Sequence, residues 1–138
     1  MPLMVRFLSL LLIVSIAGCT SSARQQPTVA VLATTRTTAL SKIKFPLDDI
    51  RSDGLRGPPD GLVSVAYEFC VPADAQVYAQ IRRIDPSVAI HPGSRGRVGC
   101  SPGMALCIGS THQAGWHDVL NALAARADVA EIRECFFE

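Results

Sequence analysis

A short segment brings together side chains that can do chemistry, namely Ser110, Thr111, His112 and Gln113. A hydroxyl beside an imidazole is the arrangement of a nucleophile and its general base, and a carboxylate usually orients the imidazole. Glu134 and Glu138, late in the chain, are the candidates for that carboxylate. One hypothesis is therefore a small enzyme with Ser110 as nucleophile and His112 as base.

The same four residues also fit the start of a helix. Ser, Thr and Gln are favoured there because their side chains pair with backbone groups that lack a partner inside the helix. Free amides and the positive end of the helix dipole also suit a small anion or a peptide. We therefore expect Thr111 to cap the following helix, and we treat the segment as a candidate binding site with no catalytic residue assigned.

A second candidate binding site is the turn-rich segment 93–99, which carries Arg95 and Arg97 between glycines. Guanidinium groups and the amides of a glycine-rich loop can hold an anion. The segment lacks the Lys-Ser/Thr ending of a nucleotide-binding P-loop. A solvated hairpin loop is the simpler interpretation, and anion or metabolite binding is the alternative.

Four cysteines lie in the second half of the chain: Cys70, Cys100, Cys107 and Cys135. In a small exported domain an even number of cysteines predicts disulfides, here two, with three possible pairings. A zinc site usually contains closely spaced cysteine pairs, whereas Cys100 and Cys107 are separated by six residues. Two disulfides are thus expected, with free thiols as the alternative, and no metal or other cofactor is predicted.

An export signal is present at the N-terminus. Residues 1–6 end in Arg6, and residues 7–18 form an apolar run of 12 residues. As a helix this run covers about 18 Å, whereas the hydrocarbon core of a bilayer is about 30 Å thick. The length therefore fits the hydrophobic region of a signal peptide better than a membrane span.

The apolar run ends in Ile16, Ala17, Gly18 and Cys19, which resembles the lipobox of bacterial lipoproteins. The resemblance covers residues 1–19. It implies cleavage before Cys19, attachment of a diacylglyceryl group to its sulfur, and fatty acylation, such as with palmitate, of the new amino terminus. Two or more acyl chains anchor stably because each buried methylene contributes about 0.8 kcal/mol. An ordinary secretory signal followed by a chance cysteine is the alternative.

The residues after the lipobox indicate the cellular location of the protein and a tether. An Asp after the lipidated cysteine resembles an inner-membrane retention signal in enteric-type bacteria. Thr20 therefore favours the outer membrane, on its periplasmic side, in a Gram-negative source. Residues 19–61 are expected to comprise the lipidated cysteine, a Thr-, Ser- and Ala-rich tether, and an irregular lead-in rich in Pro, Gly and Asp. A short strand at 29–33 is a weaker alternative within the tether.

The charge balance argues against two classes of function. Cleavage after residue 18 removes Arg6, one of the 13 basic residues, so the remainder carries 12 basic and 12 acidic residues. Proteins that bind nucleic acid normally have a marked basic excess, and electrostatic membrane attachment needs a basic cluster. We therefore expect no nucleic-acid partner and a membrane contact made through lipid.

Residues 62–138 have the patterns of a small α+β domain. Alternation of apolar, β-branched and aromatic residues predicts strands at 62–71, 87–91, 104–110 and 129–137. Apolar residues three and four apart predict helices at 72–85 and 114–126. The first strand should bury Val63, Val65, Tyr67, Phe69 and Val71 on one face.

This order of elements, β-α-β-β-α-β, is the ferredoxin-like arrangement. It predicts a four-stranded antiparallel sheet with spatial order 4-1-3-2 and two helices on one face. Met104, Leu106 and Ile108 should face the helices. The uncovered face should carry Ser64, Ala66, Glu68, Cys70, Cys107, Glu131, Arg133 and Cys135.

Three functional hypotheses follow. The first is a non-catalytic envelope module that binds a protein, a peptide or an envelope component, or has a structural role. The second is an envelope enzyme using Ser110 and His112, and the third is an anion- or metabolite-binding domain using the 93–99 loop. Geometry separates them, because a catalytic Ser110 hydroxyl should lie about 3 Å from the His112 ring, with an acidic partner behind the ring.

Overall fold

The structure, a computed structural model, describes residues 39–136. The predicted signal peptide, the lipidation site Cys19, the segment 29–33 and Glu138 lie outside the described residues. Within the described range, no helix has the length and apolar character needed to cross a membrane.

The described chain has an α+β fold, as expected, with two helices and two antiparallel sheets. The small sheet consists of β1 (Leu55–Arg56) and β2 (Val63–Ser64). The main sheet consists of β3 (Ala66–Pro72), β4 (Ala89–Pro92), β5 (Met104–Ser110) and β6 (Ile132–Cys135). The helices are α2 (Ala75–Ile84) and α3 (Trp116–Ala125).

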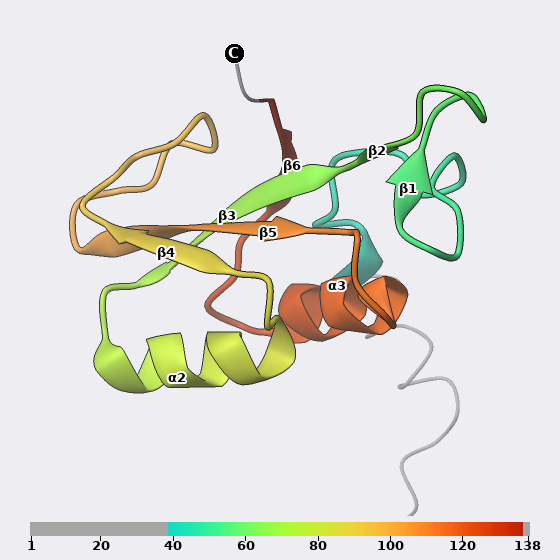
Figure 1. The fold of residues 1–138 in the computed structure, drawn as a ribbon. Coiled ribbons are helices and arrows are strands. Elements are labelled where there is room, and N and C mark those ends of the chain that lie inside the picture. Colours follow the sequence, from blue (N-terminus) through green and yellow to red (C-terminus); the bar gives the residue numbers. More distant parts are fainter. Residues whose placement is uncertain (1–38, 137–138) are drawn as a thin grey trace, which may run out of the picture.

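The main sheet is fully antiparallel, with its strands in the order β4-β5-β3-β6. Residue Phe69 of β3 lies opposite Cys107 of β5 on one side and opposite Ile132 of β6 on the other. Both helices lie on the same side of this sheet, and the loop between β4 and β5 lies on the other side (Figure 1). The predicted four-stranded antiparallel sheet is therefore confirmed.

The strand predicted at 62–71 is divided at Val65 into β2 and β3. Residues Tyr67, Phe69 and Val71 are fully buried, as their alternation predicts. Val63 was expected in the core but is 58% exposed, because β2 leaves the main sheet and pairs with β1. The chain therefore changes sheets where the sequence pattern is continuous.

Both helices begin later than predicted. Asp74 caps α2, and its Oδ1 accepts hydrogen bonds from the amides of Gln76 and Val77 at 2.8 and 3.0 Å. Helix α3 has Gly115 at its N-cap, with φ of 68° and no side-chain cap. The expectation that Thr111 caps this helix is wrong, because Thr111 lies before the cap and its hydroxyl bonds elsewhere.

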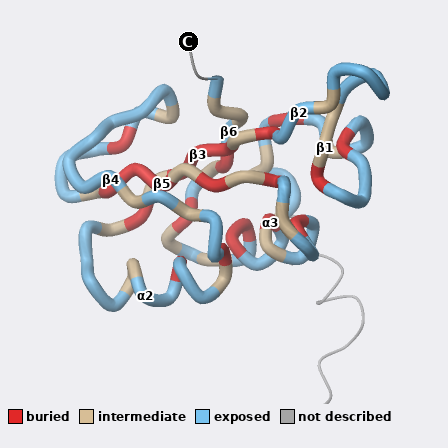
Figure 2. Tube along the Cα trace, viewed as in Figure 1, coloured by how far each residue is buried: buried red, intermediate tan, exposed pale blue. Residues whose placement is uncertain are grey.

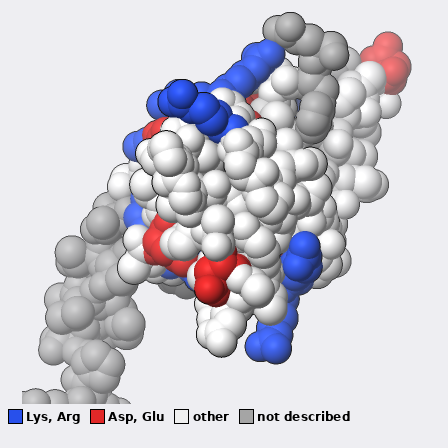
Figure 3. All heavy atoms as spheres, turned by 90° about the vertical axis from the view of Figure 1, so that its left-hand side faces the viewer, with Lys and Arg blue, Asp and Glu red and all other residues white. Residues whose placement is uncertain are grey.

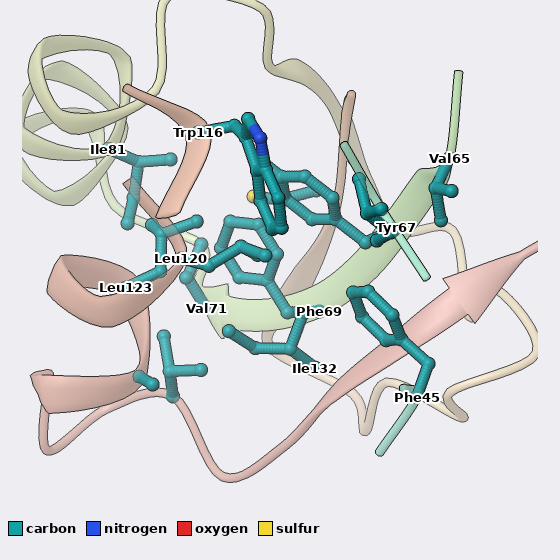
Figure 4. Packing of buried hydrophobic residues seen from close by; sticks show 14 of the residues in the cluster. Phe45, Val65, Tyr67, Phe69, Val71, Ile81, Trp116, Leu120, Leu123 and Ile132 are labelled. Atoms are coloured by element: carbon teal, nitrogen blue, oxygen red, sulfur yellow. The ribbon is translucent and has the colours of Figure 1, made fainter. Parts of the chain in front are cut away.

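The hydrophobic core lies between the sheet and the two helices (Figure 4). Its largest fully buried apolar side chains are Trp116, Tyr67, Phe69, Ile81, Leu120, Leu123 and Ile132. Each such side chain contributes about 1.5–3 kcal/mol through removal of apolar surface from water. Phe45 and Ile50, from the expected lead-in, are also buried in this core, so the folded unit begins before Leu62.

The orientation predicted for β5 is wrong. Cys107 and Ala105 lie in the core, whereas Leu106 faces the opposite side. The reason is the size of the side chains on β3, since Tyr67 lies opposite Gly109 and Phe69 opposite Cys107. Small residues on β5 leave room for these aromatic rings.

The face expected to be uncovered is covered by the loop 93–103. Leu106 and Glu68 on this face are only 4% and 2% exposed. The amide of Val98 donates a hydrogen bond to Glu68 Oε1 at 2.5 Å, and the Cα of Gly96 packs over Leu106 so tightly that an added Cβ would lie 2.5 Å from Leu106 Cδ1. The helices thus cover one side of the sheet, and the loop covers the part of the other side around Glu68 and Leu106.

One disulfide is present, between Cys70 and Cys100, instead of the two predicted. Cys107 and Cys135 are free thiols. They lie on opposite faces of the sheet, and β3 separates their strands. Neighbouring strands are about 4.8 Å apart and Cys107 and Cys135 pair with residues three positions apart on β3, so their Cα atoms are more than about 10 Å apart, beyond the span of a disulfide.

Candidate functional site

Polar side chains meet around the buried carboxylate of Asp85 at one end of the main sheet. The carboxylate of Asp85 accepts hydrogen bonds from Tyr67 Oη at 2.6 Å, Ser87 Oγ at 2.6 Å and Gln113 Nε2 at 3.0 Å. Gln113 Nε2 also lies 2.7 Å from the carbonyl oxygen of Ser110. We call these five residues the Asp85 network.

Local sequence explains how the network forms. Asp85 caps the C-terminal end of α2 because Pro86 cannot continue the helix. Its side chain accepts the amide of Ser87 at 2.9 Å, which turns the chain towards β4. The hydroxyl of Ser87 in turn accepts the amide of Ser110 at 2.9 Å. The network therefore joins α2 to the end of β5.

Tyr67 acts in this network as a hydrogen-bond donor. Both Tyr67 and Asp85 are fully buried. Burial raises the pKa of Tyr67, and the negative charge and hydrogen bond of Asp85 raise it further. The phenol therefore keeps its proton at all physiological pH values and cannot serve as a base.

The predicted pairing of Ser110 with His112 has a different geometry from that of a nucleophile and base. Ser110 Oγ accepts a hydrogen bond from the backbone amide of His112 at 3.2 Å. The ring Nδ1 of His112 lies 3.2 Å from the backbone carbonyl oxygen of Asp53. Of the two expected carboxylates, Glu134 forms an ion pair with Arg56, and Glu138 lies outside the described residues.

The side chain of Thr111 joins the main sheet to the lead-in. Its hydroxyl donates to the carbonyl oxygen of Gly54 at 2.6 Å and accepts the amide of Val65 at 3.0 Å. Gly54 has a positive φ of 80°, and a Cβ there would lie 1.7 Å from the carbonyl oxygen of Thr111. Glycine is therefore required where the lead-in passes this strand end.

A shallow hollow of about 310 Å³ lies beside the predicted site. It is lined by Ser52, Asp53, His112, Gln113 and Ala114. The hollow is open to solvent and is formed by two segments that are distant in sequence, 52–53 and 112–114. Of the four predicted residues, His112 and Gln113 line this surface, whereas the Thr111 hydroxyl is buried in backbone contacts.

The 93–99 loop has an acidic group beneath it. Arg95 lines a hollow of about 310 Å³ together with Gly93 and Ser94, while the amide of Val98 is bound by the buried Glu68 carboxylate. An anion at this amide would have to displace a carboxylate. The side of the molecule that carries this loop shows separate basic and acidic groups among uncharged atoms, not a single basic patch (Figure 3).

Arg97, the other predicted basic residue, lies where its charge acts on Cys135. The positive charge of Arg97 lowers the pKa of this thiol, but burial and the neighbouring Glu68 carboxylate raise it by more, so the net shift is upward. Burial raises the pKa of Cys107 to about 12, and the charge of Asp85 contributes in the same direction. Neither free thiol is therefore a ready nucleophile at neutral pH.

Metal ligands do not gather anywhere in the described part of the chain, where no group of three or more His, Cys, Asp and Glu side chains is positioned to hold an ion. Comparison with family models, curated proteins and solved structures found no match to this chain. The site is therefore interpreted from its own geometry.

The sequence interpretation missed Tyr67, Asp85 and Ser87. The Asp-Pro-Ser run after a helix was a usable indication, because Asp before Pro commonly turns the chain. The contact of Asp85 with Tyr67 joins residues 18 positions apart, and no local pattern predicts it.

Proposed function

We propose that this chain is a lipoprotein of the bacterial envelope, anchored through lipid on Cys19, whose folded domain is a non-catalytic binding or structural module. The observation that carries the proposal is the lipobox at residues 16–19 after a short apolar run. The Cys70–Cys100 disulfide supports it, because disulfides persist in compartments outside the cytoplasm.

The geometry around His112 supports a non-catalytic role. The imidazole contacts a backbone carbonyl, and the Ser110 hydroxyl accepts a backbone amide. In a general base, the ring nitrogen that accepts the proton faces the nucleophile, and a carboxylate behind the ring stabilises the protonated imidazole. The chain uses Ser110 and Gln113 to join its elements, as expected of a scaffold.

We further propose that the main sheet and its helices form a ferredoxin-like unit. The strand order β4-β5-β3-β6 and the position of both helices on one side support this assignment. The small β1–β2 sheet is then an addition, joined to β6 by the ion pair of Arg56 with Glu134. Such a unit leaves function to its surfaces and loops.

Fractionation of cells that produce the full chain tests the anchor. The wild-type protein should sediment with membranes and be released by detergent but not by high salt, because lipid burial is insensitive to ionic strength. A Cys19→Ala variant should lose this behaviour. A Cys135→Ala variant is the matched control and should sediment like the wild type. Membrane association that survives Cys19→Ala, or that salt removes, would contradict the proposal.

A further inference from the structure

The Cys70–Cys100 disulfide is reachable from solvent. A hollow of about 180 Å³ opens beside it, and both cysteines line that hollow together with Ser101, Met104 and Glu131. Cys70 is half-buried, whereas Cys100 is only 2% exposed. An incoming sulfur therefore has access to the Cys70 side of the bond.

The disulfide ties the loop 93–103 covalently to β3. The loop contributes no residue to the hydrophobic core, and Cys100 is its only buried side chain. Figure 2 shows the loop as exposed along nearly all of its length. Four of its residues are glycines with positive φ, so the loop loses much conformational entropy when it is held in place.

The loop closes over a buried carboxylate. Glu68 is 2% exposed under the loop, and the amide of Val98 is its hydrogen-bond donor from that loop. Removal of a carboxylate from water is costly unless hydrogen bonds replace its hydration. Opening of the loop would hydrate Glu68 and release loop entropy but would expose Leu106, and the covalent bond adds to the closed side of this balance.

We propose that the loop 93–103 is a redox-operated flap, held closed by the Cys70–Cys100 disulfide and opened by a dithiol reductant. A thiolate of the dithiol attacks Cys70 Sγ from the hollow, and Cys100 leaves as a thiolate that takes up a proton. The second thiol of the dithiol then attacks its own mixed-disulfide sulfur and releases Cys70 as a thiol. The dithiol becomes a disulfide, and two electrons and two protons pass to the protein.

Opening uncovers the second face of the main sheet. That face presents Leu106 beside Glu68, which are only 4% and 2% exposed under the closed loop, and the half-buried Ile108 lies opposite Glu68. Reduction therefore changes the surface available to a partner while the core between sheet and helices stays intact. The flap depends only on residues of the described domain and does not require lipid on Cys19.

Hydrogen exchange of the full chain in detergent, with and without dithiothreitol, tests the flap. Peptide mapping after alkylation first establishes that Cys70 and Cys100 are reduced. The amides of Val98 and Cys100, which bond to Glu68 and to the carbonyl oxygen of Arg95, should then exchange at least tenfold faster. The amides of β3 and β5 should change less than twofold.

Two variants complete the test. A Cys70→Ser/Cys100→Ser double variant should show fast loop exchange without reductant and no further response to it. A Cys107→Ala variant, altered on the other face of the sheet and outside the disulfide, should respond to reductant like the wild type. The flap is refuted if the disulfide resists the dithiol in the folded protein, if loop exchange stays unchanged after reduction, or if β3 and β5 exchange faster together with the loop.

Discussion

Substitution of Gly109 by alanine should destabilise the domain strongly, although glycine-to-alanine changes in strands are often mild. A Cβ at this position would lie 2.3 Å from Asp85 Oδ2 and 2.5 Å from Tyr67 Cε2. Oδ2 is the atom that accepts the hydrogen bond of Tyr67. The carboxylate and the ring must therefore both move, and both are fully buried.

The expected cost combines two effects. Overpacking of a filled core costs about 1–3 kcal/mol, and loss of a hydrogen bond to a charged group costs about 1.5–3 kcal/mol. We expect a loss of about 3–5 kcal/mol in the free energy of unfolding for Gly109→Ala. This is a large part of the roughly 5–15 kcal/mol that stabilises a typical domain.

Urea unfolding followed by circular dichroism measures this loss, with the midpoint falling by about 2 M for an m-value of about 2 kcal/mol/M. Gly61→Ala is the matched control, because a Cβ there would lie 3.4 Å from Pro58 Cγ, an ordinary contact, and should change stability by less than about 0.5 kcal/mol. If Gly109→Ala is as stable as Gly61→Ala, the packing described around Asp85 is incorrect.

Three further predictions concern other contacts. Thr111→Val should lower the free energy of unfolding by about 2–4 kcal/mol in urea titrations, because it removes two buried hydrogen bonds. The control His112→Ala should lower it by less than about 0.5 kcal/mol, and equal losses for the two variants would contradict the structural role of the Thr111 hydroxyl. A double-mutant cycle with Arg56→Ala and Glu134→Ala should give a coupling energy of about 1 kcal/mol, which is less than a fully buried ion pair would give because Arg56 is partly exposed. A coupling energy of zero would show that this ion pair does not hold β1 to β6. Burial raises the pKa of Cys107 to about 12 in the folded state, against 9 for the free thiol, so the unfolded state loses this proton first and the domain loses up to about 1.4 kcal/mol of stability per pH unit between about pH 9 and 12. Cys107→Ala should reduce the slope of the unfolding free energy against pH in that window, and an unchanged slope would contradict the raised pKa of this thiol.

Periodicity predicted the order and type of the main elements because it depends on which face of each element is apolar. It placed Tyr67, Phe69 and Val71 correctly in the core. It failed on β5, where the larger residue Leu106 was expected inside and Cys107 outside. The orientation of β5 depends on the ring volume of the neighbouring strand, which is information from another part of the chain.

The candidate site was predicted less well than the fold. The segment 110–113 does lie at a strand end, but its function there depends on Asp85 and Gly54, which are distant in sequence. The covering of Glu68 by the 93–103 loop was also missed, because a glycine-rich exposed segment carries no pattern that indicates which surface it covers. Likewise, the cysteine number predicted two disulfides without a pairing, and the second does not form because Cys107 and Cys135 lie on opposite faces of the sheet.

Lipid anchoring through Cys19 is tested by intact-mass and peptide mass spectrometry of the protein isolated from its native membrane. We expect a chain that begins at Cys19 and carries a diacylglyceryl group on the sulfur of that residue. A chain that begins elsewhere, or an unmodified sulfur at Cys19, would contradict it.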